Sequence, residues 1–285
     1  MDLEYLRAHP HRLPMLVEHQ RIRFTPIDGG VTSVAQRLTF DDGTDVFAKL
    51  HEREPADLLP AQRRGLEWLT EAGAPVPRVW CGTETLLVTR WLSSGEPTAA
   101  GASALGAALA RTHRAGASAW GAEWAGYVGS VAVDNSPSTR PWADWFRNRL
   151  TTLLTRCVIT GNLDDADAAI VNAALSRIPD ADDEPVSRLH GDLRTANLHW
   201  DAAGDGWFID PSAHGGHRET DLSTLALDEP PHLESIIAGY ESVWPLEPGW
   251  RERQGLHQLY PLLVDVAAFG SSARDRLMTI ARRYR

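Results

Sequence analysis

A short stretch in the second half of the chain combines residue types that can position a hydroxyl group and hold metal ions. Asp192 is followed five residues later by Asn197, and Asp210 comes thirteen residues after that asparagine. This spacing, with a short hairpin before the second aspartate, is typical of a kinase catalytic loop and its metal-binding aspartate. The pattern predicts phosphoryl transfer, in which Asp192 orients the acceptor hydroxyl while Asn197 and Asp210 hold Mg²⁺.

Phosphoryl transfer explains why each of these residue types is needed. Its loose transition state requires an acceptor held in line and cations that neutralise the phosphate oxygens. Each residue also has an ordinary structural explanation, because aspartate caps helices and asparagine favours turns. Their combination, downstream of a β-rich segment that could form the other half of a cleft, favours the catalytic interpretation.

The first part of the chain offers a cation for the phosphates of ATP. Lys49 lies in an apolar run over 46–50 and is the only lysine in the sequence. A buried cation is costly unless it meets an anion, whereas an edge-strand lysine facing water is the ordinary alternative. A glycine-rich turn at residues 28–33 precedes Lys49 in the sequence and could cover the phosphates with its backbone amides. The predicted nucleotide-binding residues are Gly29, Gly30, Thr32, Ser33, Lys49, Gln62, Arg90, Trp91 and Leu92.

These residues must be positioned by two kinds of structure. Alternating apolar residues and turn signals predict antiparallel strands, and one apolar repeat of helical period predicts a helix over 57–72. The predicted strands cover residues 21–27, 31–40, 45–50, 78–81 and 86–92.

Beyond about residue 93, alanine- and leucine-rich runs favour helices, with a hairpin over 197–209 and a turn-rich loop over 116–141 that is a candidate functional loop. We therefore expect an α+β, bilobal, protein-kinase-like fold. Its small antiparallel-sheet lobe (1–92) carries one helix, and its larger lobe (93–285) is mainly helical. The predicted helices cover about 101–115, 141–157, 162–178, 232–243 and 250–269.

Composition limits the class of ligand. The 285-residue chain has a net charge of −10 and a pI near 5.5, whereas nucleic-acid-binding proteins usually carry a basic face. It has no long apolar run, and its charged start does not resemble a signal peptide. Cys81 and Cys157 are too few for a disulfide framework and are expected to be structural thiols. We expect a cytoplasmic monomer that binds small molecules, without nucleic-acid or membrane partners.

The motifs together resemble the fructosamine-kinase (ketosamine-3-kinase) family, which is related to the aminoglycoside phosphotransferases. The likeness extends over most of the chain and is carried by residues 190–197, by Ile-Asp-Pro at 209–211 and most specifically by Gly-Gly-His-Arg-Glu at 215–219. The resemblance implies ATP- and Mg²⁺-dependent phosphorylation of a sugar hydroxyl on a small or protein-bound ketosamine, which is a deglycation activity. It also implies that Glu219 and Asp221 fix the loop after Asp210.

Four departures from the family pattern concern the details of the site. Gln62 stands where the family usually has a glutamate paired with the lysine, although its amide could still accept a hydrogen bond from Lys49. Arg194 replaces a tryptophan and Asp265 a histidine at positions expected to face the acceptor, and Thr195-Ala196 replaces a pair of small residues. The predicted substrate residues are Arg194, His217 and Asp265.

These departures leave alternatives open. Another acceptor, such as an aminoglycoside or a choline-like metabolite, would explain Arg194 and Asp265. A nucleotide-binding pseudokinase would explain Gln62. Arg194 itself could bind the carboxylate of a glycated amino acid, or it could face solvent or pair with an acidic neighbour. A zinc site is disfavoured because the histidines at 190, 214 and 217 lack an evident further ligand.

Overall fold

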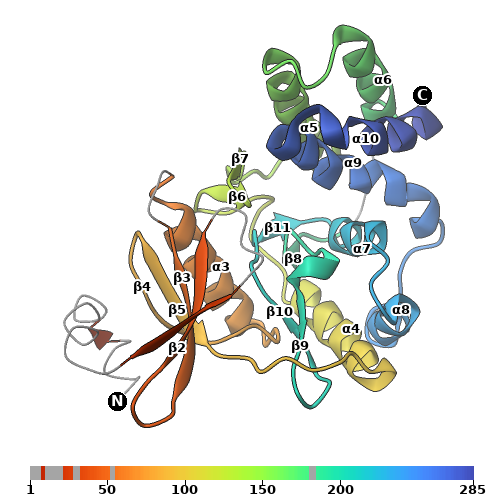
Figure 1. Cartoon of the computed structure of the whole chain (residues 1–285). Helices are drawn as coiled ribbons and strands as arrows, with labels where there is room; N and C mark the ends of the chain where they lie inside the picture. The colour runs from red at the N-terminus through yellow and green to blue at the C-terminus, as the bar shows by residue number, and fades with distance from the viewer. Residues whose placement is uncertain (1–7, 10–21, 28–32, 52–54, 180–183) are drawn as a thin grey trace.

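The structure, a computed structural model, describes residues 8–9, 22–27, 33–51, 55–179 and 184–285. An antiparallel sheet built from the first part of the chain lies beside a larger part that is mostly helical (Figure 1). The predicted α+β organisation is therefore confirmed.

The sheet contains the five predicted strands in the spatial order β1-β2-β3-β5-β4. On β3, Val46 and Ala48 are fully buried in a small cluster, while Phe47 and Lys49 alternate with them and reach a cleft on the other face. Because successive side chains of a strand point to opposite faces, this register decides where Lys49 lies. The strands are β1 (Arg23–Ile27), β2 (Val34–Thr39), β3 (Asp45–Leu50), β4 (Val79–Gly82) and β5 (Leu86–Arg90).

Helix α3 (Leu58–Glu71) connects the sheet to the helical part. Its buried leucines join one hydrophobic cluster with residues of β4, β5, α4 (Ala99–Arg114), α7 (Arg218–Leu227) and α8 (Leu233–Glu241). A Cβ atom added at Gly65 would lie 3.1 Å from the Ala213 Cβ, so a glycine allows α3 to approach the segment after Asp210 closely. The two parts share a core, and the boundary near residue 93 stays a prediction.

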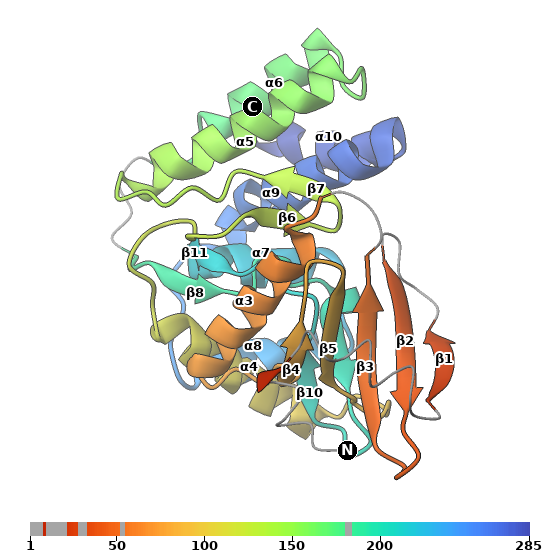
Figure 2. The ribbon, with the colours of Figure 1, turned by 90° about the vertical axis from the view of Figure 1, so that its left-hand side faces the viewer.

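Five helices of the second part match the predicted ones: α4, α5 (Trp142–Ile159), α6 (Asp165–Leu175), α8 and α9 (Trp250–Phe269). Figure 2 shows α5, α6 and α10 (Arg274–Ala281) stacked at the end remote from the sheet. Helices α7 and α10 were not predicted. Residues 218–225 of α7 are all buried although most are polar, so a search for apolar periodicity finds no signal there.

Short strand pairs shape the loops between the helices. The predicted hairpin is formed by β9 (Leu198–Trp200) and β10 (Gly206–Phe208), and the turn-rich segment contains a hairpin of β6 (Gly126–Val128) and β7 (Val131–Val133). Strand β8 (Ser187–Leu189) pairs with β11 (His214–Gly216), which brings the loop after β8 next to the segment after β10.

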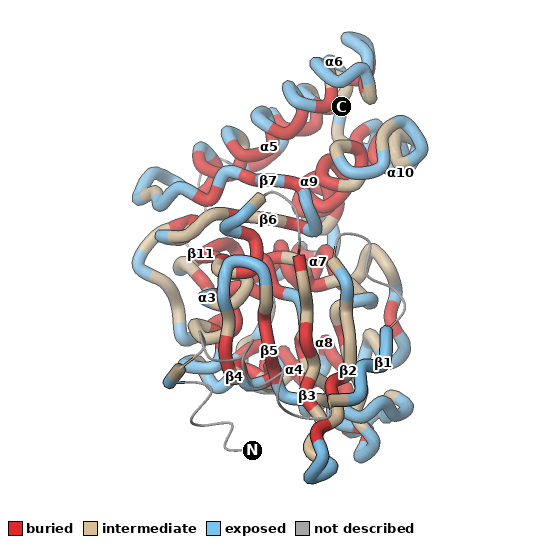
Figure 3. The backbone as a smooth tube through the Cα atoms, turned by 60° about the vertical axis from the view of Figure 1, so that its left-hand side comes forward, coloured by how far each residue is buried: buried red, intermediate tan, exposed pale blue. Residues whose placement is uncertain are grey.

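The interior of the helical part surrounds α9, which packs against α5, α7 and α10 and is buried along most of its length (Figure 3). Cys81 and Cys157 are free and buried, and burial raises the pKa of each thiol to about 11. Since the thiolate is the reactive form, both cysteines suit structural roles. Among the described helices, none combines the length and the apolar character that a membrane span requires.

Candidate active site

A cleft of about 750 Å³ is lined by residues of both parts of the protein. Strand β3 and helix α3 contribute from one side, and the loop between β8 and β9, the segment after β10 and helix α9 contribute from the other. The cleft brings together Lys49, Asp192, Asn197 and Asp210, the four residues from which phosphoryl transfer was predicted.

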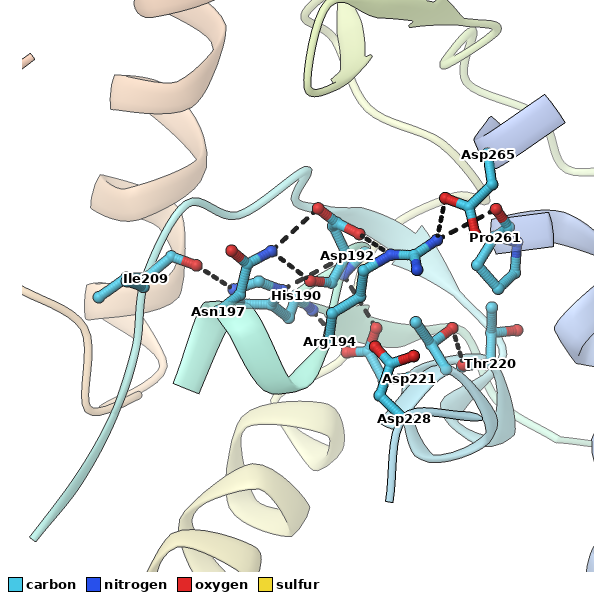
Figure 4. A network of polar contacts seen from close by, with 12 residues as sticks. His190, Asp192, Arg194, Asn197, Ile209, Thr220, Asp221, Asp228, Pro261 and Asp265 are labelled. Atoms are coloured by element: carbon cyan, nitrogen blue, oxygen red, sulfur yellow. Dashed lines mark hydrogen bonds and ion pairs between the residues drawn. The ribbon is translucent and has the colours of Figure 1, made fainter. Parts of the chain in front are cut away.

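The loop between β8 and β9 is held in one conformation by its own side chains. Gly191 has φ +82°, and a Cβ atom there would lie 2.1 Å from the carbonyl oxygen of Ser212, so the loop requires glycine at this position. The Nδ2 atom of Asn197 donates to the backbone carbonyl of Asp192 at 2.8 Å and to its Oδ2 atom at 2.9 Å (Figure 4). These bonds orient the carboxylate that faces the cleft.

Asp221 of α7 anchors the start of the same loop. Its carboxylate accepts hydrogen bonds from the backbone amides of His190 at 2.7 Å and Gly191 at 2.9 Å, and it lies 3.2 Å from the Nε2 atom of His113. Burial alone would raise the pKa of Asp221, but the hydrogen bond and charge of His113 and the loop amides hold it below its usual range. A buried charge thus positions the residues that precede Asp192.

The expected roles of Glu219 and Asp221 are corrected by these contacts. Both were expected to fix the loop after Asp210, whereas Asp221 binds the loop before Asp192. The carboxylate of Glu219 instead accepts from Arg253 at 2.5 and 3.0 Å, and one of its oxygens lies 3.5 Å from His257 Nε2, while its backbone amide donates to His217 in the segment after Asp210. Glu219 therefore ties α7 to α9.

Asp210 is contacted from the sheet side of the cleft. Its Oδ1 atom lies 3.0 Å from Nζ of Lys49 and accepts a hydrogen bond of 2.9 Å from Nε2 of Gln62. The expectation that the Gln62 amide accepts from Lys49 is not met: Nε2 of Gln62 donates to Asp210, and its Oε1 atom has no hydrogen-bond partner among the described residues. Asp210 has φ +51°, an uncommon conformation for a residue other than glycine and one that is frequent at functional sites.

The oxygen atoms at Asn197 and Asp210 suit a hard divalent cation. Because the Asn197 amide nitrogen is used by Asp192, its side-chain oxygen is the atom that can face a metal. Lys49 and Gln62 both contact Oδ1 of Asp210, so Oδ2 remains as a metal ligand. One amide oxygen and one carboxylate, completed by phosphate oxygens and water, form the kind of ligand set that Mg²⁺ prefers.

At the acceptor end of the cleft, Arg194 is paired with acidic neighbours. Its Nη2 atom lies 2.8 Å from Oδ1 of Asp265 and donates to the carbonyl oxygen of Pro261 at 3.1 Å, and its Nε atom lies 3.2 Å from Oδ1 of Asp192 (Figure 4). Burial by itself would lower the pKa of Arg194, but the negative charges of Asp265 and Asp192 outweigh this effect, so the pKa of Arg194 is raised. Of the two roles considered for Arg194, pairing with an acidic neighbour is the one observed.

Other predicted site residues lie away from the cleft lining. His217 is 2 % exposed and begins α7, where its Nδ1 atom accepts from the backbone amide of Glu219 and its ring packs against Trp142. This buried position argues against the predicted substrate contact. Arg90, the last residue of β5, and residues 91–92 after it are outside the lining, whereas Ser33 belongs to it. Gly29, Gly30 and Thr32 lie outside the described residues.

The sequence interpretation missed several lining residues. The end of β6 and the turn after it contribute residues 127–130, and Asp228 follows directly after α7. Helix α9 contributes Val264, Ala268 and Phe269 beside Asp265. The abundance of turn residues over 116–141 was the signal for the first group. No local pattern marks the others, because they reach the cleft only through the packing of α7 and α9.

The histidines at 190, 214 and 217 do not form a metal-binding group. Within the described part of the chain, the group with suitable spacing is His217, Glu219 and His257, whose ligand atoms lie within 4.8 Å of one another. Arg253 occupies both carboxylate oxygens of Glu219, so this cluster is best explained as a buried ion-pair network.

Comparisons with known proteins find similar sequences and structures over most of the chain. The family model described as "Fructosamine kinase" matches residues 15–284. A probable ketoamine kinase of Escherichia coli O157:H7 is 32% identical over 265 residues, which cover 86% of each chain. The crystal structure of a fructosamine-3-kinase candidate from Thermobifida fusca is 35% identical, with a TM-score of 0.87 over 97% of this chain and 98% of that one.

The fold is shared more widely. A macrolide 2'-phosphotransferase from Brachybacterium faecium is only 16% identical but superposes with a TM-score of 0.62 over 95% of this chain and 98% of that one. The predicted protein-kinase-like phosphotransferase fold is thus confirmed.

Proposed function

Because the chain belongs to the fructosamine kinase family, whose relatives are named for kinase activity on ketoamines, we propose that Lys49, Asp192, Asn197 and Asp210 transfer the γ-phosphoryl group of ATP to a sugar hydroxyl of a ketosamine. The protein is a phosphotransferase with an alcohol group as acceptor. The observation that carries the proposed residue roles is the meeting of these four side chains in one cleft.

In the nucleotide half of this proposal, the ammonium of Lys49 contacts the α- and β-phosphates of ATP. Asn197 and Asp210 would hold Mg²⁺, which when bound neutralises charge on the phosphate oxygens. The contact between Lys49 and Asp210 keeps the phosphate-binding cation next to the metal-binding carboxylate. In this proposal, the triphosphate lies between Lys49 on the sheet and the metal held by Asp210 after β10.

In the acceptor half, Asp192 accepts the hydroxyl proton and aims the oxygen at the γ-phosphorus. The acceptor O–H bond breaks as its oxygen bonds to phosphorus, the bond from the bridging oxygen to phosphorus breaks, and ADP leaves. Asn197 fixes the orientation of the carboxylate. Burial raises the pKa of Asp192 against the attraction of Arg194, which makes the carboxylate a better proton acceptor.

The alternatives receive less support. A pseudokinase was considered because Gln62 replaces a glutamate, but Gln62 hydrogen-bonds Asp210, and the four reactive residues share one cleft. The likeness to antibiotic phosphotransferases is one of fold alone at 16% identity. A cytoplasmic location, a monomeric state, a deglycation role and the absence of nucleic-acid and membrane partners stay predictions from the sequence.

The test is a coupled ADP-release assay with Mg-ATP over ketosamines, the corresponding free sugars, aminoglycosides and choline. We expect turnover with ketosamines and little or none with the other acceptors. Turnover with aminoglycosides alone would contradict the substrate class. Binding of Mg-ATP without ADP release from any acceptor would favour the pseudokinase instead.

A further inference from the structure

The acceptor end of the cleft contains one guanidinium between two carboxylates. Arg194 contacts Asp192 through Nε and Asp265 through Nη2, and all three residues line the cleft. Their side chains are only 16%, 14% and 15% exposed, respectively, so water screens their charges weakly. One positively charged side chain is therefore shared by two negatively charged carboxylates at the acceptor end of the cleft.

The nearby charges do not remove this imbalance. Asp228, the remaining acidic residue of this end of the cleft, lies 3.0 Å from the Nη2 atom of Arg276 and so has a cationic partner of its own. Arg276 also attracts Asp265, but it is shared with Asp228, so Asp192, Arg194 and Asp265 by themselves contain two carboxylates and one guanidinium. A buried negative charge is costly unless a cation approaches it, so this cluster favours a cationic acceptor.

An apolar strip of α9 continues from the acidic cluster. Val264, Ala268 and Phe269 line the cleft beside Asp265, and residues 265 and 269 are four apart, which places them on one face of the helix. Phe269 is 57% exposed, unusually so for a large apolar residue in this protein. An acceptor can therefore place a cation at Asp265 and an apolar group against Ala268 and Phe269.

We propose that Asp265 selects acceptors whose sugar carries a protonated amine with an apolar substituent, and that Ala268 and Phe269 receive this substituent. The inference rests on the proposed function, because the amine of a ketosamine lies next to the sugar that is phosphorylated. The ammonium donates to the carboxylate of Asp265 while the sugar hydroxyl donates to Asp192. Asp265 is thus a specificity-determining residue that contacts the substrate.

The same geometry disfavours acceptors that carry a carboxylate near the amine. The guanidinium of Arg194 already contacts two carboxylates and a backbone carbonyl, so an incoming anion would have to displace one of them and would meet Asp192 and Asp265 at close range. Glycated amines with long apolar chains should therefore be preferred to glycated free α-amino acids.

The experiment compares two acceptors of the same shape. N-butyl-fructosamine carries a protonated amine, whereas 1-O-butyl-fructose has a neutral ether oxygen in its place. With the wild type we expect kcat/KM for the amine to exceed that for the ether by about 10- to 100-fold, the range of a charge-assisted hydrogen bond. Asp265→Asn should remove most of this ratio by lowering kcat/KM for the amine alone.

Two further measurements separate recognition of the amine from a structural role. Asp265→Asn also removes a partner of Arg194, and a loosened Arg194 would lower kcat/KM for both acceptors equally. The control Asp275→Asn removes a carboxylate that is 94% exposed on α10 and should preserve the ratio. The affinity for Mg-ATP, measured by calorimetry, should be the same in all three proteins.

The outcomes distinguish the inference from the function on which it rests. If the wild type phosphorylates both acceptors equally well, or if Asp265→Asn preserves the ratio, the inference is wrong and the assignment to ketosamines stands. If the wild type phosphorylates neither acceptor, the proposed function is wrong and the inference is wrong with it. A similar loss with both acceptors in Asp265→Asn would assign Asp265 to the support of Arg194.

Discussion

The Nζ atom of Lys49 lies 3.0 Å from Oδ1 of Asp210, so an ion pair joins the sheet to the helical part across the cleft. The two residues are far apart in the sequence and belong to different secondary-structure elements. Their side chains are 13% and 46% exposed, and a partly exposed pair of this kind contributes little to stability, about 0–1 kcal/mol. The value of the pair lies in where it places a cation and a carboxylate.

Replacing Lys49 should affect nucleotide binding far more than folding. Lys49→Met removes the cation expected at the ATP phosphates, and we expect calorimetry to show an affinity for Mg-ATP weaker by about 10- to 100-fold. The midpoint of urea unfolding should hardly move. Arg64→Met, at an exposed position of α3, is the matched control and should bind Mg-ATP normally. If the two variants bind Mg-ATP with equal affinity, Lys49 does not contact the phosphates.

Asp192→Asn should separate chemistry from binding. The amide keeps the shape of the carboxylate but cannot accept the hydroxyl proton, so kcat should fall on the order of 100-fold or more. The affinity for Mg-ATP should stay close to that of the wild type, because Asp192 is not expected to hold the metal. Turnover near the wild-type rate would show that another group receives the proton.

Asp210→Ala should abolish the dependence of nucleotide binding on Mg²⁺. The carboxylate of Asp210 is the charged protein ligand expected for the metal, and it also contacts Lys49 and Gln62. The variant loses all of these interactions. Titrations with ATP in the presence and in the absence of Mg²⁺ should therefore give similar affinities, whereas the wild type should bind more tightly with Mg²⁺. If Mg²⁺ still strengthens binding in the variant, the metal site lies elsewhere.

Asp221→Asn should loosen the start of the catalytic loop, which the Asp221 carboxylate holds by hydrogen bonds. The carboxylate is fully buried and accepts from the amides of His190 and Gly191, so we expect a loss of about 3 kcal/mol in the free energy of unfolding. Hydrogen exchange at these two amides should be faster, and kcat should fall while the KM for ATP changes little. A stable variant with unchanged exchange would show that the loop is held by other contacts.

Glu219 makes the stability of the protein dependent on pH in the acidic range. Burial by itself would raise its pKa, but His257 and Arg253 outweigh burial and lower the pKa to about 2 from the ordinary 4.5. A lowered carboxyl pKa stabilises the fold above the ordinary pKa, and this contribution is lost as the pH falls toward the lowered value.

The test compares the wild type with Glu219→Gln in urea unfolding between pH 7 and pH 3. The stability advantage of the wild type should be constant near neutrality and shrink below about pH 4.5, because the unfolded chain then takes up a proton at Glu219 that the folded protein does not bind. An advantage that stays constant down to pH 3 would contradict the lowered pKa.

The sequence by itself determined the sheet, most of the helices and the candidate reactive residues. The five strands and helices α3, α4, α5, α6, α8 and α9 were predicted because alternation and helical periodicity are local properties of the chain. The spacing of Asp192, Asn197 and Asp210 indicated phosphoryl transfer for the same reason, since one loop and one hairpin carry all three. Lys49 was indicated by the cost of placing a lone cation in an apolar strand.

Only the tertiary structure decided which partners these residues have. Gln62 donates to Asp210, Arg194 pairs with Asp265, and Asp221 binds the amides before Asp192, all across long separations in the sequence. A polar side chain can bond with many groups of similar chemistry, and the packing of α3, α7 and α9 selects among them. Helix α7 escaped prediction for a related reason: its buried charged residues, Arg218, Glu219 and Asp221, have partners distant in the sequence, which no local pattern reveals.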